Sequence, residues 1–166
     1  TDPTDPTDPT DPTDPTDPTD PVSEMLNEIT KPLYFINNNS KASYLGNFNN
    51  YTFQNGQQFY SYGNKKASIP TNTTISMDID FGKTNNQITN GKVVIDDVSN
   101  SVQKSLNFEG DINKTNSTLD LYPRNGSHGA GGSGTFYGSE AQLIKGNVNM
   151  INDNVQIRGN FEATKK

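Results

Sequence analysis

Two aspartates, Asp78 and Asp80, are placed where carboxylates could work as a pair. They lie two residues apart in a run of alternating polar and apolar residues, so a strand would carry both on one face. There the two carboxylates could share a proton or hold a cation. The intervening residues are apolar, which predicts that the aspartate face is the one in water. Solvated carboxylates have little reason to shift their pKa values, so we expect neither acid–base catalysis nor a metal site here.

The single histidine, His128, is the second candidate for chemistry. It follows Ser127 in a glycine-rich stretch, but a hydrolytic triad also needs a carboxylate and an oxyanion hole, and no serine lies in a G-x-S-x-G motif. One histidine cannot form a multi-histidine metal site. We therefore expect His128 to lie in an exposed loop.

Three other stretches resemble ligand-binding motifs, but each lacks a residue or a structural context that the motif requires. The stretch GAGGSG from Gly129 follows an Asn-Gly turn, whereas a dinucleotide site needs a preceding strand and a following helix. Residues 82–84 read GKT, but Met77 replaces the first glycine of a P-loop. A calcium-loop pattern from Asp111 has Asn116 where the turn requires glycine. The sequence predicts no enzyme, no bound cofactor and no metal ion.

The negative charge of the chain is concentrated at its start. Residues 1–21 are seven copies of Thr-Asp-Pro and hold seven of the 19 acidic residues, so the rest carries 12 acidic and 13 basic residues. A nearly neutral body gives no basic face for nucleic acid or an anionic membrane, and we expect it to bind neither. The absence of cysteine excludes disulfides, thiol nucleophiles and thiolate metal sites.

The repeat over residues 1–21 predicts a disordered, extended spacer. Each proline fixes its own φ and disfavours helix at the preceding aspartate, and the aspartates repel one another. At about 3.1 Å per residue in the polyproline II limit, the spacer could reach roughly 65 Å. A spacer is useful when its end is fixed, so we expect a lipid-bearing cysteine just before Thr1, as in bacterial surface lipoproteins. An incidental low-complexity tail or an expression remnant is the alternative.

Residues 22–41 are expected to contain a short helix and a connecting segment. Ser23 could cap its first turn, and Pro32 limits how far it could continue. Four apolar residues recur at the spacing of one helix face: Val22, Met25, Leu26 and Ile29. A helix this short is marginal alone and must dock on the rest of the protein.

Residues 42–166 are expected to form one all-β domain. Apolar residues alternate with polar ones in four runs: Ile75, Met77, Ile79 and Phe81; Leu106, Phe108 and Ile112; Ile144, Val148 and Met150; and Val155, Ile157, Phe161 and Ala163. Short turn signals separate such runs: Asn55-Gly56, Lys83–Asn86, Asn113–Asn116, Asn125-Gly126 and Asn152–Asn154. Links this short join antiparallel neighbours, which predicts an antiparallel meander.

Glycines inside the runs favour closure of the meander into an up-and-down barrel. Gly46, Gly110, Gly146 and Gly159 would weaken a flat sheet but suit strands that bend sharply. About eight or nine strands would then close and leave no exposed edge. A β-sandwich is the competing architecture. We expect the domain to be a monomer.

Seven aromatic residues gather between positions 44 and 62, and they are the first candidate for a partner site: Tyr44, Phe48, Tyr51, Phe53, Phe59, Tyr60 and Tyr62. Some must fill the barrel, but adjacent strand residues such as Phe59 and Tyr60 point to opposite faces, so one of them should be exposed. Exposed aromatics commonly anchor protein interfaces. The stretch 123–132, expected as a loop with Arg124 and His128, is the second candidate.

Four segments resemble a known family. SMDIDFGK (76–83), ITNGKV (88–93), GSGTFYGSEA (132–141) and the closing GNFEATKK (159–166) are similar to the β-barrel domain of transferrin-binding protein B and its relatives. The resemblance covers about residues 42–166. It implies an eight-stranded barrel, displayed on the outer membrane of a Gram-negative bacterium through a lipid anchor, that binds a host protein. This chain is similar to the small single-barrel members, such as factor H binding protein and the compact surface lipoproteins of Pasteurellaceae.

The resemblance implies a non-enzymatic binder of a host serum protein, and we expect a soluble complement regulator of the factor I or factor H type. The named candidates for contact are Tyr51, Phe53, Phe59, Tyr60, Tyr62, Arg124 and His128. One alternative is a barrel that takes up haem or an iron protein, with His128 as a possible axial ligand. Another is a purely structural surface protein.

Overall fold

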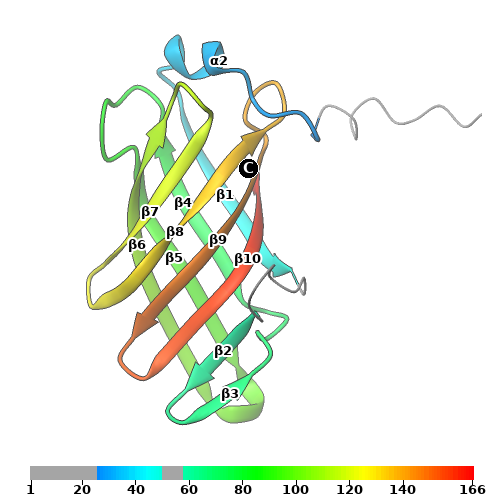
Figure 1. The fold of residues 1–166 in the computed structure, drawn as a ribbon, viewed down its shortest axis with the longest axis vertical. Coiled ribbons are helices and arrows are strands. Elements are labelled where there is room, and N and C mark those ends of the chain that lie inside the picture. Colours follow the sequence, from blue (N-terminus) through cyan, green and yellow to red (C-terminus); the bar gives the residue numbers. More distant parts are fainter. Residues whose placement is uncertain (1–25, 50–57) are drawn as a thin grey trace, which may run out of the picture.

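The computed structural model describes residues 26–49 and 58–166 (Figure 1). Within these ranges it contains one short α-helix, one 3-10 helix and ten strands. Their bounds are α2 (Pro32–Ile36), β1 (Lys41–Asn49), β2 (Phe59–Tyr62), β3 (Lys65–Ala67), β4 (Thr74–Asp80), β5 (Ile88–Asp97), η1 (Val98–Asn100), β6 (Val102–Asn113), β7 (Thr118–Arg124), β8 (Ser127–Tyr137), β9 (Leu143–Asn152) and β10 (Val155–Lys165). Neither helix has the length and apolar character of a membrane span.

Eight of the strands form a closed antiparallel barrel, as the sequence predicts. The hydrogen-bonded order is β1-β4-β5-β6-β7-β8-β9-β10, and β1 also pairs with β10, which closes the circle (Figure 1). The hairpin β2–β3 is an addition that lies between β1 and β4 in the chain. It pairs with the first residues of β10, from Val155 to Arg158, whereas β1 pairs with the last part of that strand.

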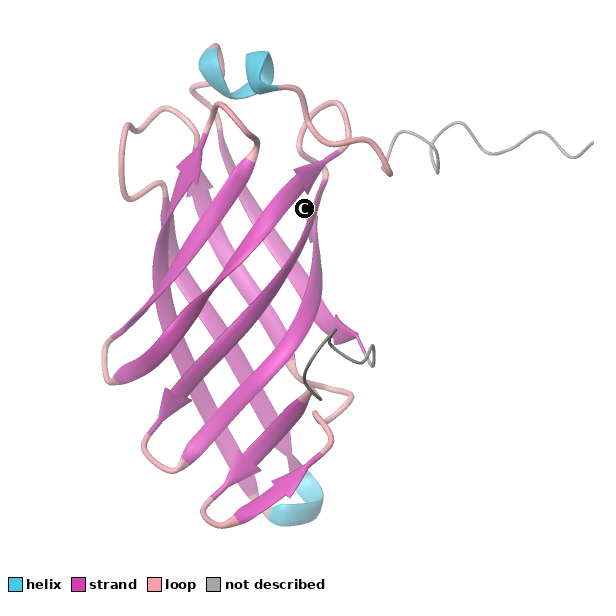
Figure 2. Cartoon of the chain, in the orientation of Figure 1, coloured by secondary structure: helices cyan, strands magenta, loops and turns pink. Residues whose placement is uncertain are grey.

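The barrel has two unlike ends, which Figure 2 shows well. Helix α2 and the turns at 82–87, 114–117 and 138–142 lie at one end, here called the helix end. The described chain also begins there. The β2–β3 hairpin, the turns 125–126 and 153–154, and η1 lie at the opposite end, here called the hairpin end.

The strand alternation places the apolar residues inside the barrel, as predicted. All the apolar residues of the four runs named above are buried, Ile75 and Phe161 among them. Aromatic rings fill the interior toward the helix end. The ring of Phe136 lies 5.1 Å from that of Phe35, 6.2 Å from that of Phe81 and 6.3 Å from that of Tyr44, measured between centroids. Helix α2 thus covers this end of the barrel with the buried ring of Phe35 and the partly buried ring of Tyr34, which lies 5.7 Å from that of Phe81.

The N-terminal helix was predicted from Val22 to Ile29, and this position is wrong for residues 26–29, which the structure describes. Residues 26–28 form a turn, and Ile29 pairs with Tyr137 as an isolated β-bridge. The helix instead begins at Pro32, because proline fits the first turn of a helix, where its missing N–H has no partner to lose. Residues 22–25 of the expected helix and the spacer 1–21 lie outside the described residues.

Candidate functional site

The structure brings the two predicted partner-binding candidates to the same end of the barrel. Strand β2, which carries Phe59, Tyr60 and Tyr62 of the aromatic stretch, and the β7–β8 turn both lie at the hairpin end, whereas Tyr44 and Phe48 belong to β1 (Figure 1). The β9–β10 turn joins them, because Gly63 N–H donates to the carbonyl oxygen of Asn154 at 2.9 Å and Asn152 pairs with Ser127. Three hairpin turns that are far apart in the sequence therefore form one continuous rim.

The aromatic residues of β2 divide between the two faces of the strand. Tyr60 is fully buried, whereas Phe59 is half-buried on the outer side, which agrees with the expectation that one of the two lies outside. Tyr62 stacks on Tyr60 at 5.3 Å and is half-buried at the rim. Tyr51 and Phe53 lie outside the described residues.

Two lysines of β3 lie over the half-buried aromatic rings of β2. The Nζ of Lys66 lies 4.1 Å from the centre of the Phe59 ring, and that of Lys65 lies 5.7 Å from the centre of the Tyr62 ring. Cations over ring faces are attracted by the π electrons. The four residues form two cation–ring pairs, Phe59 with Lys66 on the outer face of the hairpin and Tyr62 with Lys65 on the face that carries Tyr60. Together they are here called the aromatic–lysine patch.

The sequence interpretation missed the two lysines of this patch, although a signal for them existed. Gly63-Asn64 is a two-residue turn between strand-like residues, and such a turn sets the register of the hairpin it connects. That register pairs Tyr62 with Lys65 and Ser61 with Lys66. Reading the turn as a hairpin would have placed both lysines beside the aromatics.

The expected loop over residues 123–132 is wrong. Strand β7 continues to Arg124 and β8 begins at Ser127, so only Asn125 and Gly126 form the turn. Both have positive φ, 52° and 86°, which matches the twist of a tight hairpin. The following glycines belong to a strand with a bulge between Gly129 and Gly131.

Arg124 and His128 remain at the surface within this hairpin. His128 is exposed and lies opposite Ile151 of β9. Arg124 donates from Nε to the Glu109 carboxylate at 3.2 Å. Neither side chain contributes to a cluster of metal ligands in the part of the chain that the structure describes.

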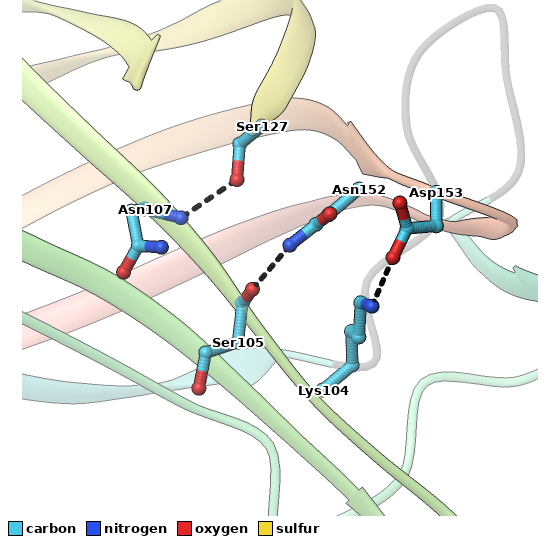
Figure 3. Close-up of polar contacts among 6 residues, drawn as sticks. All are labelled: Lys104, Ser105, Asn107, Ser127, Asn152 and Asp153. Atoms are coloured by element: carbon cyan, nitrogen blue, oxygen red, sulfur yellow. Dashed lines mark hydrogen bonds and ion pairs between the residues drawn. The ribbon is translucent and has the colours of Figure 1, made fainter. Parts of the chain in front are cut away.

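Side-chain contacts hold the hairpin end together where β7 stops (Figure 3). Strand β6 pairs with β7 only from Asn107 onward, so its first residues have no strand on that side. Three contacts from β6 close the gap: Asn107 N–H donates to Ser127 Oγ at 2.9 Å, Asn152 Nδ2 donates to the Ser105 carbonyl oxygen at 2.9 Å, and Lys104 forms an ion pair with Asp153. The turns of the rim are thereby fixed to the barrel wall.

The ion pair between Lys104 and Asp153 leads to a testable prediction for the pKa of Asp153. The hydrogen bond and charge of Lys104 hold the pKa of Asp153 below its ordinary value. The Lys104→Met variant should therefore show a higher Asp153 pKa in a carboxyl-carbon NMR titration. Because the folded-state pKa is below the unfolded one, the pair contributes stability above the unfolded pKa and loses it as the pH falls through the folded value. Lys92→Met, at an exposed position of β5, should leave Asp153 unchanged, and equal pKa values in all three proteins would contradict the assignment.

The aspartate pair Asp78 and Asp80 lies on the outer face of β4, as predicted. Asp78 accepts hydrogen bonds from Ser43 Oγ at 2.6 Å and from Asn90 Nδ2 at 2.9 Å. These bonds lower the pKa of Asp78, so the expectation of an unshifted carboxylate is wrong for this residue. Asp80 lies 3.5 Å from the ammonium of Lys41. The two carboxylates therefore have separate partners in the wall of the barrel.

The sequence matches no family model and no curated protein. Among solved structures, the barrel is similar to a double variant of the vaccine antigen transferrin-binding protein B from Haemophilus parasuis, with a TM-score of 0.54 and 17% identity. A single variant of the same protein gives a TM-score of 0.51 and 18% identity. Each comparison covers 83% of this chain and only 28% of the other. The resemblance inferred from the sequence motifs is confirmed at the level of fold, which is a β-barrel like that of transferrin-binding protein B.

Proposed function

We propose that this protein is a lipid-anchored lipoprotein on the bacterial outer surface that binds a host protein through the hairpin end of its barrel. The observation that carries the proposal is the aromatic–lysine patch, which places Phe59 and Tyr62 beside Lys65 and Lys66 on a rim of fixed turns. Aromatic residues are enriched in protein interfaces and commonly anchor them. Because the patch lies on paired strands, little conformational entropy is lost when a partner docks.

The position of the patch supports the same proposal. The described chain begins at the helix end, and the patch lies at the opposite end (Figure 1). A spacer that joins the barrel at the helix end and a lipid at its far terminus would direct the hairpin end away from the cell. A host protein would then meet the patch first.

The partner that we propose is a soluble complement regulator of the factor I or factor H type, and the role is binding without catalysis. The similar solved structures are named for binding transferrin. A barrel that binds an iron protein is therefore the second candidate. Uptake of haem into the barrel is less well supported, because fully buried aromatic rings occupy its interior toward the helix end.

A serum pull-down with the full chain, immobilised through its N-terminus, tests the proposal. We expect one complement regulator to be retained, as identified by mass spectrometry. The double variant Phe59→Ala with Tyr62→Ala should weaken its binding by at least about tenfold, since truncation of central aromatic anchors commonly costs that much. Recovery of transferrin would support the second candidate, and recovery of no specific serum protein would refute both.

A matched control comes from the helix end, where Leu33 and Ile36 are 66% and 63% exposed. The double variant Leu33→Ala with Ile36→Ala removes a similar apolar area from the opposite end of the barrel. Its binding should equal that of the unmodified protein. If this variant loses binding and the Phe59 and Tyr62 variant does not, the hairpin end is not the contact surface.

A further inference from the structure

Three Asn-Gly pairs occur in the sequence, and the structure describes two of them in unlike surroundings. Asn90-Gly91 lies within β5, Asn125-Gly126 forms the β7–β8 turn, and Asn55-Gly56 lies outside the described residues. The backbone nitrogen that follows an asparagine can attack the side-chain amide carbon, and glycine has no Cβ atom to shield that nitrogen. The surroundings of each pair decide whether this reaction can proceed.

The backbone N–H of Gly126 is free of the hydrogen bonds of the sheet. Asn125 and Gly126 are both exposed, and their φ values of 52° and 86° are those of a two-residue type I′ turn. In such a turn the closing hydrogen bond joins the two flanking residues, so the N–H of the second turn residue takes no part in it. Accordingly, no backbone carbonyl oxygen of the described chain accepts from the Gly126 N–H.

The space around this turn is open to water and to rotation of the asparagine side chain. A Cβ atom added to Gly126 would have only the side-chain oxygen of Asn152 nearby, at 4.0 Å. The side-chain amide of Asn125 makes no hydrogen bond with the described part of the chain. Its Cγ atom can therefore turn toward the Gly126 nitrogen without breaking an existing contact.

The pair Asn90-Gly91 is held in place instead. Asn90 donates from Nδ2 to the Asp78 carboxylate at 2.9 Å. Gly91 is buried and pairs with Phe108 in the β5–β6 ladder, where an added Cβ atom would collide with the Phe108 ring. Attack by the Gly91 nitrogen would require this part of the sheet to open first, and such opening costs free energy.

We propose that Asn125 is a site of spontaneous deamidation in the folded protein, at which the β7–β8 turn is converted to aspartate and isoaspartate. The deprotonated Gly126 nitrogen attacks Cγ of Asn125, so that a nitrogen–Cγ bond forms, the Cγ–Nδ2 bond breaks and ammonia leaves. Water then opens the resulting succinimide ring. Opening at Cγ gives aspartate, and opening at the backbone carbonyl carbon gives isoaspartate. The net reaction consumes the amide and one water and yields a carboxylate and ammonium.

Both products change the rim of the hairpin end. Each adds one negative charge to the turn, directly after Arg124. Isoaspartate also adds one carbon atom to the main chain of a two-residue turn, which would displace Ser127 from its place. Ser127 Oγ accepts from Asn107 N–H at 2.9 Å, one of the contacts that fix this turn to the barrel wall. The inference goes beyond the proposed function and does not depend on it.

Peptide mapping by mass spectrometry tests the site. The full chain is kept at neutral pH and body temperature, one portion folded and one unfolded in guanidinium chloride, and is digested at intervals. In the folded protein Asn125 should deamidate at least about tenfold faster than Asn90, because the turn reacts without opening of a strand pair. In the unfolded protein the two sites should react within about threefold of each other, because neither is protected.

Labelled water and two variants identify the reaction and its product. When the incubation is done in water enriched in oxygen-18, the new carboxylate should carry one heavy oxygen. Asn125→Gly keeps a residue that tolerates positive φ and should abolish the modification of the turn, with the rate at Asn90 unchanged. Asn125→Asp serves as the standard for the aspartate product and should melt close to the unmodified protein. The purified isoaspartate form should melt lower and exchange the Asn107 amide hydrogen faster.

Three results would overturn the proposal. One is an equal rate for Asn125 and Asn90 in the folded protein. Another is modification of Asn125 in guanidinium chloride alone, which would mean that the turn protects its asparagine. The third is formation of aspartate without isoaspartate, since a succinimide opens at both carbonyl carbons and direct hydrolysis of the side chain gives aspartate only.

Discussion

Replacing Phe136 by alanine is expected to lower the free energy of unfolding by about 3–5 kcal/mol, the usual cost of truncating a fully buried aromatic residue. Phe136 has no exposed surface and contacts the rings of Phe35, Phe81 and Tyr44. Its removal would leave a cavity between the barrel wall and helix α2, which these rings hold in place. Because domains of this size are stable by only about 5–15 kcal/mol, the variant should lose a large fraction of its stability.

Urea unfolding followed by circular dichroism measures this effect. Thr135→Ala is the matched control, since Thr135 is the preceding residue of β8, is half-buried and lies on the outer face. It should cost well under about 1 kcal/mol, as most surface substitutions do. Phe136→Leu keeps most of the volume and should fall between the two. A Phe136→Ala protein as stable as the Thr135 variant would mean that the aromatic cluster does not hold the helix end closed.

Replacing Gly46 by alanine is expected to open the barrel at its closing pair of strands. Gly46 of β1 faces Ala163 of β10, and a Cβ atom added there would lie 1.9 Å from the carbonyl oxygen of Glu162 and 2.5 Å from the Cα of Ala163. Both atoms are backbone, so no side chain can move aside, and the strands must separate. Overpacking costs typically about 1–3 kcal/mol and sometimes more, and we expect the upper end of that range.

The Gly46 effect should be visible both in stability and in local opening. Amide hydrogen exchange should accelerate in β1 and β10 more than in β6, because the clash is confined to the closing pair. Gly82→Ala is the control, since the nearest atom to its added Cβ is a side-chain oxygen of Asp80 at 3.3 Å, which can shift. Unchanged exchange in β1 and β10 of the Gly46 variant would show that closure does not depend on this contact.

Much of the fold was predictable from short-range patterns. The alternation over Ile75–Phe81 correctly assigned the buried face, because side chains on a strand alternate strictly and the core selects one set. The error over residues 123–132 has a local cause as well. A run of glycines suggests a loop, yet here the glycines sit in β8, where Gly131 has a φ of 82° and its backbone lies close to Leu121.

The candidate site was only partly predictable. The adjacency of Phe59 and Tyr60 required that they point to opposite faces, but it could not say which one is buried. Pro32 was taken as the end of a helix when it is the beginning of one, since proline satisfies the sequence pattern of both.

The sequence by itself determined the all-β class, the antiparallel order of the hairpins and the inward-facing residues, because these depend on a two-residue period and on turns that act over a few positions. Only the tertiary structure decided that β2, the β7–β8 turn and the β9–β10 turn share one rim. The physical reason is closure. When β1 pairs with β10, residues far apart in the chain become neighbours across the barrel, and their register depends on the packing of the whole core rather than on any local pattern.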